Sequence, residues 1–274
     1  MAAQPDPDIV LYDLACTKHI SFSPVVWRIR LMLNYKNITY KTVFLGFPDI
    51  EPTLKNISNP LRFICTSRHI GAALDYTRRS SPANSKSPSG VVPGEASKYT
   101  VPANQHVPTN TYIMDSLPIA QFLESTYPDP PVPLTSDLGC EIETKGRGVL
   151  GRAIYSSVMP REVHILSPRS QENFRRMREA ALGHRLEDLL DGDKEERVWD
   201  GVSDAMGAIG ELMRTHKADG PFVLGARPSY TDFFIAGSLQ SNRVVGEGVF
   251  QRMIKYPGYG EVYGECLPYL EGKD

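Results

Sequence analysis

The N-terminal part of the chain alternates between apolar and polar positions in a pattern that predicts a strand, a helix and a second strand. Residues 9–14 form a short β-rich run. After Ser23 and Pro24, apolar residues return every three or four positions, which is the spacing of a helix with one buried face. Residues 38–45 alternate again and are rich in β-branched side chains. This order predicts a βαβ unit with parallel pairing.

The regular pattern then disappears between about residues 58 and 97. A short helix over 49–57 would precede this stretch, which contains a low-complexity serine- and proline-rich segment over 80–89. We expect a flexible insertion rather than a domain, although so long a loop is unusual in a compact unit. Strand-like runs return at 99–103 and 111–114, and an amphipathic stretch follows.

A stiff, proline-rich connector over 128–133 marks the expected domain boundary. After it, three segments carry helical stripes of apolar residues, and none has a convincing strand pattern. The sequence therefore predicts an α/β domain over 1–128, which includes the insertion, and an all-helical domain over 134–274.

Composition and charge narrow the class of protein. The chain has 274 residues, of which 41% are hydrophobic and 23% charged, as in ordinary globular proteins. A net charge of −2 and the lack of a basic stripe give no reason to expect nucleic acid as a partner. No secretory signal and no apolar run of about 20 residues is apparent, and the four cysteines lack metal-ligand spacing. We expect a cytoplasmic protein with reduced thiols, no membrane partner and no metal.

A serine hydroxyl lies at the start of the first predicted helix, in the segment Ser21-Phe-Ser23-Pro-Val-Val-Trp27-Arg28. Backbone N–H groups and the helix dipole favour negative charge at such a position, which is what a thiolate requires. The alternative is that Ser23 only caps the helix, and for an isolated serine this interpretation is the more common one.

Two further pairs of residues offer groups for a peptide-like ligand. A cis bond at Val101-Pro102 would turn the Val101 backbone toward a ligand for strand-like pairing; a trans loop proline is the alternative. Asp115-Ser116 opens a predicted helix, where the carboxylate suits an ammonium group and the hydroxyl suits a carboxylate. The alternative for this pair is an ordinary helix cap.

A fourth feature, over residues 225–234, is structural. Ser229 and Asp232 have the spacing of a capping box at the start of a buried helix, and we assign no chemistry to them.

Together these four features resemble the glutathione transferase superfamily. That family joins a thioredoxin-like domain, with a cis-proline and an acidic-Ser pair before the third helix, to an all-helical domain. Residues 221–233 are the most specific match in the second domain, and residues 11–14 with 23–28 further resemble the fungal serine-type and β-etherase-like branch. The resemblance covers nearly the whole chain outside about 58–97 and 134–170.

The resemblance implies a role for each matching residue. Ser23 would donate a hydrogen bond to the glutathione sulfur, with Ser21 as the alternative. Val101 would pair its backbone with the cysteinyl part, Pro102 would hold that geometry, and Asp115 with Ser116 would bind the γ-glutamyl end. Because Cys16 lies upstream of this position, a thiol-exchanging member of the family is less favoured.

The insertion is the main departure from the family. It falls where the second helix and the loop to the cis-proline strand are expected, so we name no residue for the glycyl end of glutathione. One hypothesis is that residues near 58–90 reflect a mis-drawn exon boundary, which tryptic peptides spanning 68–78 would refute.

The implied function is a glutathione transferase-like enzyme that activates the glutathione thiolate for attack on a small hydrophobic electrophile. Both conjugation and ether cleavage fit, and the fungal branch suggests secondary metabolism. A homodimer is expected from the family alone. The alternative is a non-catalytic module that uses the same fold to bind or regulate a partner.

Overall fold

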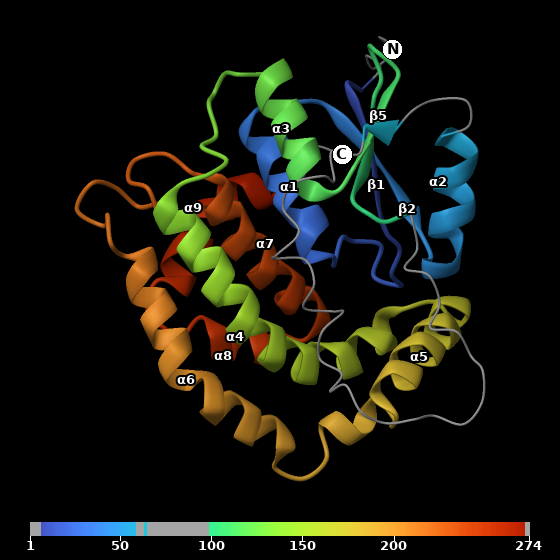
Figure 1. Cartoon of the computed structure of the whole chain (residues 1–274), viewed down its shortest axis with the longest axis vertical. Helices are drawn as coiled ribbons and strands as arrows, with labels where there is room; N and C mark the ends of the chain where they lie inside the picture. The colour runs from blue at the N-terminus through green and yellow to red at the C-terminus, as the bar shows by residue number, and fades with distance from the viewer. Residues whose placement is uncertain (1–6, 59–62, 65–98, 272–274) are drawn as a thin grey trace.

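The computed structural model describes residues 7–58, 63–64 and 99–271, which form an α/β part and a helical part packed against each other (Figure 1). The α/β part contains, in chain order, the elements β1 (Ile9–Leu14), α1 (Pro24–Tyr35), β2 (Tyr40–Leu45), η1 (Phe47–Asp49), α2 (Ile50–Ser58), β3 (Phe63–Ile64), β4 (Ala103–His106), β5 (Thr111–Met114) and α3 (Ser116–Thr126).

The described strands form one five-stranded sheet in the order β2-β1-β4-β5-β3. β1 pairs in parallel with β2 and antiparallel with β4, and β5 pairs antiparallel with β4 and in parallel with β3. The predicted βαβ unit is therefore confirmed. Helices α1 and α3 cover one face of the sheet and α2 covers the other (Figure 1).

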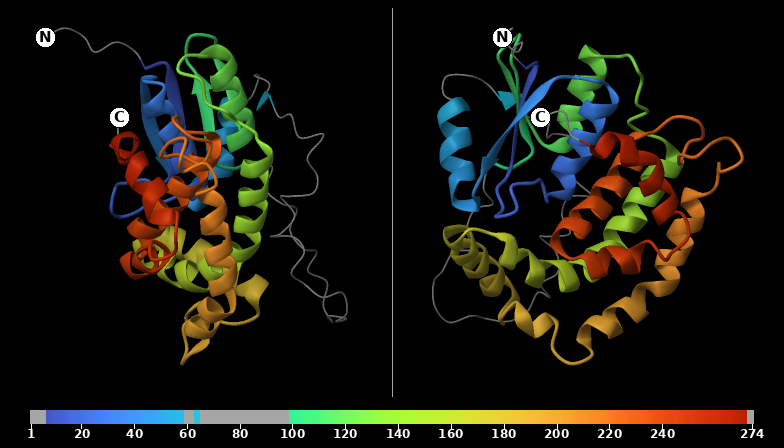
Figure 2. Two further views of the ribbon diagram at one scale, coloured as in Figure 1. Left: turned by 90° about the vertical axis from the view of Figure 1, so that its left-hand side faces the viewer. Right: turned by 180° about the vertical axis from the view of Figure 1, so that it is seen from behind.

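The rest of the described chain is helical, which confirms the predicted fold class of a thioredoxin-like domain followed by an all-α domain. Its elements are α4 (Asp137–Glu162), η3 (Val163–Ile165), α5 (Pro168–Leu182), η4 (Glu187–Leu189), α6 (Lys194–Met213), α7 (Tyr230–Val245), α8 (Glu247–Met253) and α9 (Tyr259–Leu270). Helix α7 lies at the centre, where it packs against α1 on one side and against α4, α8 and α9 on the others (Figures 1 and 2).

Helix α7 begins at the predicted capping box, which is confirmed. The Ser229 hydroxyl accepts a hydrogen bond from the Asp232 N–H, and the buried Asp232 carboxylate accepts one from the Ser229 N–H at 2.7 Å. The same carboxylate accepts the Val223 N–H at 2.9 Å and so ties down the preceding loop. Three local donors thus fix where this buried helix starts.

Close approach between helices requires glycine at one position of α7. A Cβ at Gly237 would lie 3.0 Å from the Arg28 backbone nitrogen and 3.1 Å from the Pro24 carbonyl oxygen. A side chain here would therefore force the backbone of the first turns of α1 to move by a few tenths of an ångström.

The segment expected to be a flexible insertion is regular at its start, which corrects that prediction in part. Ser58 closes α2, and Phe63–Ile64 pair with β5 as a strand, so the second helix of the α/β part is in place rather than displaced. The remainder of 58–97 lies outside the described residues, so the structure does not test the exon-boundary hypothesis. Val101 and Pro102 also differ from expectation, because β4 begins just after them, at Ala103.

The described residues include three of the four cysteines and all the helices given above, which concern the expected thiols and the membrane. Cys16, Cys140 and Cys266 are free cysteines in this part of the chain. Cys16 is buried and its thiol donates to the Ile20 carbonyl at 3.2 Å. Across residues 7–58, 63–64 and 99–271, no helix has the length and apolar character needed to span a membrane.

Candidate functional site

The first candidate group is the hydroxyl of Ser23, the N-cap residue of α1. Its backbone is extended and its carbonyl accepts the Trp27 N–H at 2.9 Å, yet its side chain makes no capping hydrogen bond. Ser23 therefore occupies the N-cap position, as the alternative interpretation expects, but its hydroxyl does not cap the helix. No acidic side chain lies in the first turn of α1, so the positive end of the helix dipole is not offset locally.

The loop that carries Ser23 is held by the helical part. Ser241 of α7 donates its hydroxyl to the Phe22 carbonyl at 2.5 Å. Further back in the loop, the N–H and hydroxyl of Thr17 both donate to the Ile165 carbonyl in η3, at 2.7 and 3.1 Å. Groups far away in the sequence thus set the path of the chain into α1.

Ser21, the alternative catalytic hydroxyl, faces inward. Its carbonyl accepts the Trp27 indole N–H at 2.9 Å, and its hydroxyl is buried without a formed hydrogen bond among the described residues. The hydroxyl lies near the Asp13 carboxylate, close enough to lower the Asp13 pKa but not in hydrogen-bond geometry. Burial raises the pKa of Asp13, while the Arg30 guanidinium at 3.2 Å acts in the opposite direction.

The second candidate group is the backbone of Val101. The Val101–Pro102 bond is cis, which confirms that expectation. The Pro102 carbonyl accepts the Asp115 N–H at 3.1 Å, so this turn is joined directly to the start of α3. Within the part of the chain that the structure describes, no hydrogen bond uses the N–H or carbonyl of Val101.

The third candidate group is the pair Asp115-Ser116 at the start of α3. Asp115 is exposed, has φ 71° and ψ 140°, and makes no side-chain cap hydrogen bond. This conformation is strained for a residue with a Cβ, and such strain is common at ligand sites. Thr100 donates its hydroxyl to Asp115 Oδ1 at 3.1 Å, a contact that no sequence signal indicated.

The strand register brings the three groups to one end of the sheet. Ala103 pairs with Tyr12 near the end of β1 and with Met114 at the end of β5. The loop from β1 to α1, the cis-proline turn before β4 and the start of α3 after β5 therefore leave the same edge. Helix α1 also packs against α3. The predicted residues thus lie at the same end of the sheet.

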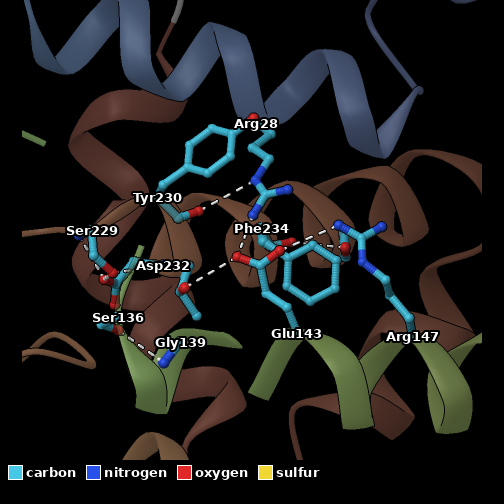
Figure 3. Close-up of polar contacts among 11 residues, drawn as sticks. Arg28, Ser136, Gly139, Glu143, Arg147, Ser229, Tyr230, Asp232 and Phe234 are labelled. Atoms are coloured by element: carbon cyan, nitrogen blue, oxygen red, sulfur yellow. Dashed lines mark hydrogen bonds and ion pairs between the residues drawn. The ribbon is translucent and has the colours of Figure 1, made fainter. Parts of the chain in front are cut away.

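A polar cluster joins this end of the α/β part to the helical part (Figure 3). Arg28 of α1 is buried and lies over the Tyr230 ring, 3.7 Å from its centroid. Its guanidinium donates to the Tyr230 carbonyl at 3.3 Å and to the Glu143 carboxylate of α4 at 2.5 Å. Arg147 and the Thr231 hydroxyl also donate to Glu143, at 3.2 and 3.1 Å. The sequence did not predict this cluster.

Comparisons with known proteins agree with this geometry. Residues 22–126 match the model of the glutathione S-transferase N-terminal domain, and residues 143–252 match that of the C-terminal domain. The glutathione S-transferase-like protein ustS of Aspergillus flavus is 30% identical over 268 residues, which cover 92% of this chain and 86% of that protein. The chain therefore belongs to the glutathione transferase superfamily.

Solved structures show the same fold. A glutathione S-transferase of Ceriporiopsis subvermispora, solved in complex with glutathione, has a TM-score of 0.74 and 26% identity over 95% of this chain and 97% of its own. The glutathione transferase FuA2 of Phanerochaete chrysosporium has a TM-score of 0.75 and 25% identity over 98% of this chain and all of its own, printed as 100%.

Proposed function

We propose that this protein is an enzyme that binds glutathione at the assembled end of the sheet and activates its thiolate for attack on a small hydrophobic electrophile. The reaction would be conjugation or ether cleavage, with secondary metabolism as the setting. The observation that carries the proposal is the Ser23 hydroxyl, which stands at the positive end of α1 and is not used to cap the helix.

In this mechanism Ser23 donates its hydroxyl hydrogen to the glutathione sulfur. The hydrogen bond and the helix dipole stabilise the thiolate relative to the thiol, so the bound thiol ionises near neutral pH. Ser21 and Ser23 are equally buried, each at 3% exposed. We favour Ser23 because it adjoins the start of α1, whereas the Ser21 hydroxyl faces the Asp13 carboxylate.

The remaining groups position the tripeptide. The Val101 backbone pairs with the cysteinyl part, in a turn that Pro102 shapes, and Asp115 with Ser116 binds the γ-glutamyl ammonium and carboxylate. The electrophile lies against the helical part, and holding both reactants together supplies the rest of the rate enhancement. A cytoplasmic location and a homodimer are further expectations of this proposal.

The test measures thiolate formation and turnover separately. The absorbance of the glutathione thiolate, titrated with pH on the wild type and on Ser23→Ala, reports the pKa of the bound thiol. We expect the pKa of bound glutathione to lie well below that of the free thiol in the wild type and to rise by about one to two units in the variant. Turnover of an aryl halide should fall about 10- to 100-fold.

Ser21→Ala is the matched control, since it removes a hydroxyl two residues away, and its thiol titration should resemble that of the wild type. Activity that survives in Ser23→Ala but not in Ser21→Ala would transfer the catalytic role to Ser21. Binding of glutathione without turnover on a panel of electrophiles would support the non-catalytic module instead.

A further inference from the structure

A single peptide group lies between the helical part and the candidate catalytic serine. The Phe22 carbonyl belongs to the peptide bond that leads into Ser23, and it accepts the Ser241 hydroxyl of α7 at 2.5 Å. Both partners are in the interior, since Phe22 is 2% and Ser241 is 4% exposed. Within residues 7–58, 63–64 and 99–271, no second hydrogen bond reaches this carbonyl. Ser241 therefore satisfies a buried backbone acceptor directly beside Ser23.

This hydrogen bond constrains the position of Ser23. Because a peptide group is planar, holding its oxygen also holds the plane that contains the nitrogen and Cα of Ser23. On the other side, Pro24 restricts Ser23 to extended backbone, which it has at φ −78° and ψ 122°. The Ser23 carbonyl is held as well, since it accepts the Trp27 N–H at 2.9 Å. With the backbone fixed from both sides, rotation about the Cα–Cβ bond sets the direction of the Ser23 hydroxyl.

Close packing of α7 against α1 makes this contact possible (Figure 1). Ser241 lies four residues after Gly237 and so on the same face of α7. A Cβ added at Gly237 would meet the Arg28 nitrogen and the Pro24 carbonyl oxygen, so the backbones of the two helices lie close together here. A serine side chain is short, and its hydroxyl reaches the loop before α1 because the helices approach each other in this way.

We propose that Ser241 is a positioning residue, which holds the peptide group between Phe22 and Ser23 so that the Ser23 hydroxyl is aligned with the glutathione sulfur. The inference rests on the proposed function, in which Ser23 donates to that sulfur. A hydrogen bond weakens steeply when its donor is misaligned, so a loosened Ser23 stabilises the thiolate less. The helical part thus contributes to thiolate formation through one hydroxyl, which acts only through Ser23.

The experiment titrates the thiol of bound glutathione in Ser241→Ala by its thiolate absorbance and measures turnover of an aryl halide across the same pH range. We expect the pKa of the bound thiol to rise by about half a unit to one unit. Turnover below the wild-type pKa should then fall about three- to tenfold, and it should return to the wild-type level at a pH where both proteins hold the thiolate. S-hexylglutathione, which has no free thiol, should bind both proteins with the same Kd.

Ser238→Ala is the matched control. Ser238 is a buried serine of the same helix, but its hydroxyl donates at 2.7 Å to the Phe234 carbonyl of α7 itself. Its thiol titration and its pH profile of turnover should match those of the wild type. In a Ser23→Ala background, Ser241→Ala should shift the pKa of the bound thiol no further, because its action passes through the Ser23 hydroxyl.

Three results would overturn the inference alone: a wild-type thiol pKa in Ser241→Ala, a loss of turnover that is equal at every pH or matched by weaker binding of S-hexylglutathione, or a further shift of the pKa in the Ser23→Ala background. The second of these is what a purely structural role of Ser241 would produce. If the wild type does not lower the pKa of bound glutathione, or if Ser23→Ala leaves it unchanged, the proposed role of Ser23 fails and this inference fails with it.

Discussion

Replacing Asp115 by glycine should raise the stability of the protein and weaken its binding of glutathione. A residue with a Cβ in the observed conformation, φ 71° and ψ 140°, costs about 1–3 kcal/mol. Glycine removes that cost, but it adds about 0.5–1 kcal/mol of unfolded-chain entropy, and the exposed hydrogen bond from Thr100 is worth about 0.5 kcal/mol. The net stabilisation is roughly 1 kcal/mol, which raises Tm by about 2–4 °C for a chain of this size.

Denaturant unfolding and calorimetric titration of glutathione test both halves of this prediction. Asp115→Ala keeps the strain and loses the contact with Thr100, so the free energy of unfolding should rank glycine above aspartate above alanine. Both variants should bind glutathione about tenfold or more weakly, because the carboxylate that we propose for the ammonium group is gone. A glycine variant less stable than the wild type would refute the strain argument.

Three other changes have outcomes that follow from packing and burial. Gly237→Ala should lower the free energy of unfolding by about 1–3 kcal/mol in denaturant unfolding, because the added methyl group meets the backbone of α1. Gly207→Ala, whose methyl group would lie in open space on α6, is the control and should be neutral or stabilising. Equal effects of the two substitutions would contradict the packing argument. Asp232→Ala should lower the free energy of unfolding by about 3–5 kcal/mol, since it leaves the buried donors of Val223 and Ser229 unsatisfied. A loss below about 1 kcal/mol in denaturant unfolding would show that the loop before α7 rearranges to satisfy them. Burial raises the pKa of Glu162 from 4.5 to about 7, so within that range the folded state holds a proton that the unfolded state has released. Wild-type stability should therefore fall by about 3 kcal/mol at most as pH rises from about 4.5 to about 7, and Glu162→Gln should remove that fall. Parallel Tm–pH curves for the two proteins would be evidence against it.

Local signals predicted the elements that local chemistry determines. Pro24 after Ser23 marked the start of α1, and the spacing of Ser229 and Asp232 marked that of α7. These signals need only neighbouring residues, and strand periodicity likewise predicted β1 and β2. The sequence could name candidate residues for glutathione for the same reason, since each lies at an element boundary, and their roles stay predictions.

Elements that depend on tertiary contacts were not predictable in this way. Helix α4 is rich in glycine and has little periodicity, yet it forms because Ser136 caps it and Gly139 allows Thr231 to approach. Strand β3 is two residues long and exists only through its pairing with β5. The Arg28–Glu143 pair joins residues 115 positions apart, a separation that no sequence pattern encodes.

The hydroxyl of Ser241 on the Phe22 carbonyl has a consequence for protein engineering. A chimera that joins this α/β part to the helical part of another protein would lose the Ser241 hydrogen bond that holds the segment leading to Ser23. Crossover points should therefore keep α7 together with α1, as a single inherited block, if a recombinant is to retain the path of the chain into α1.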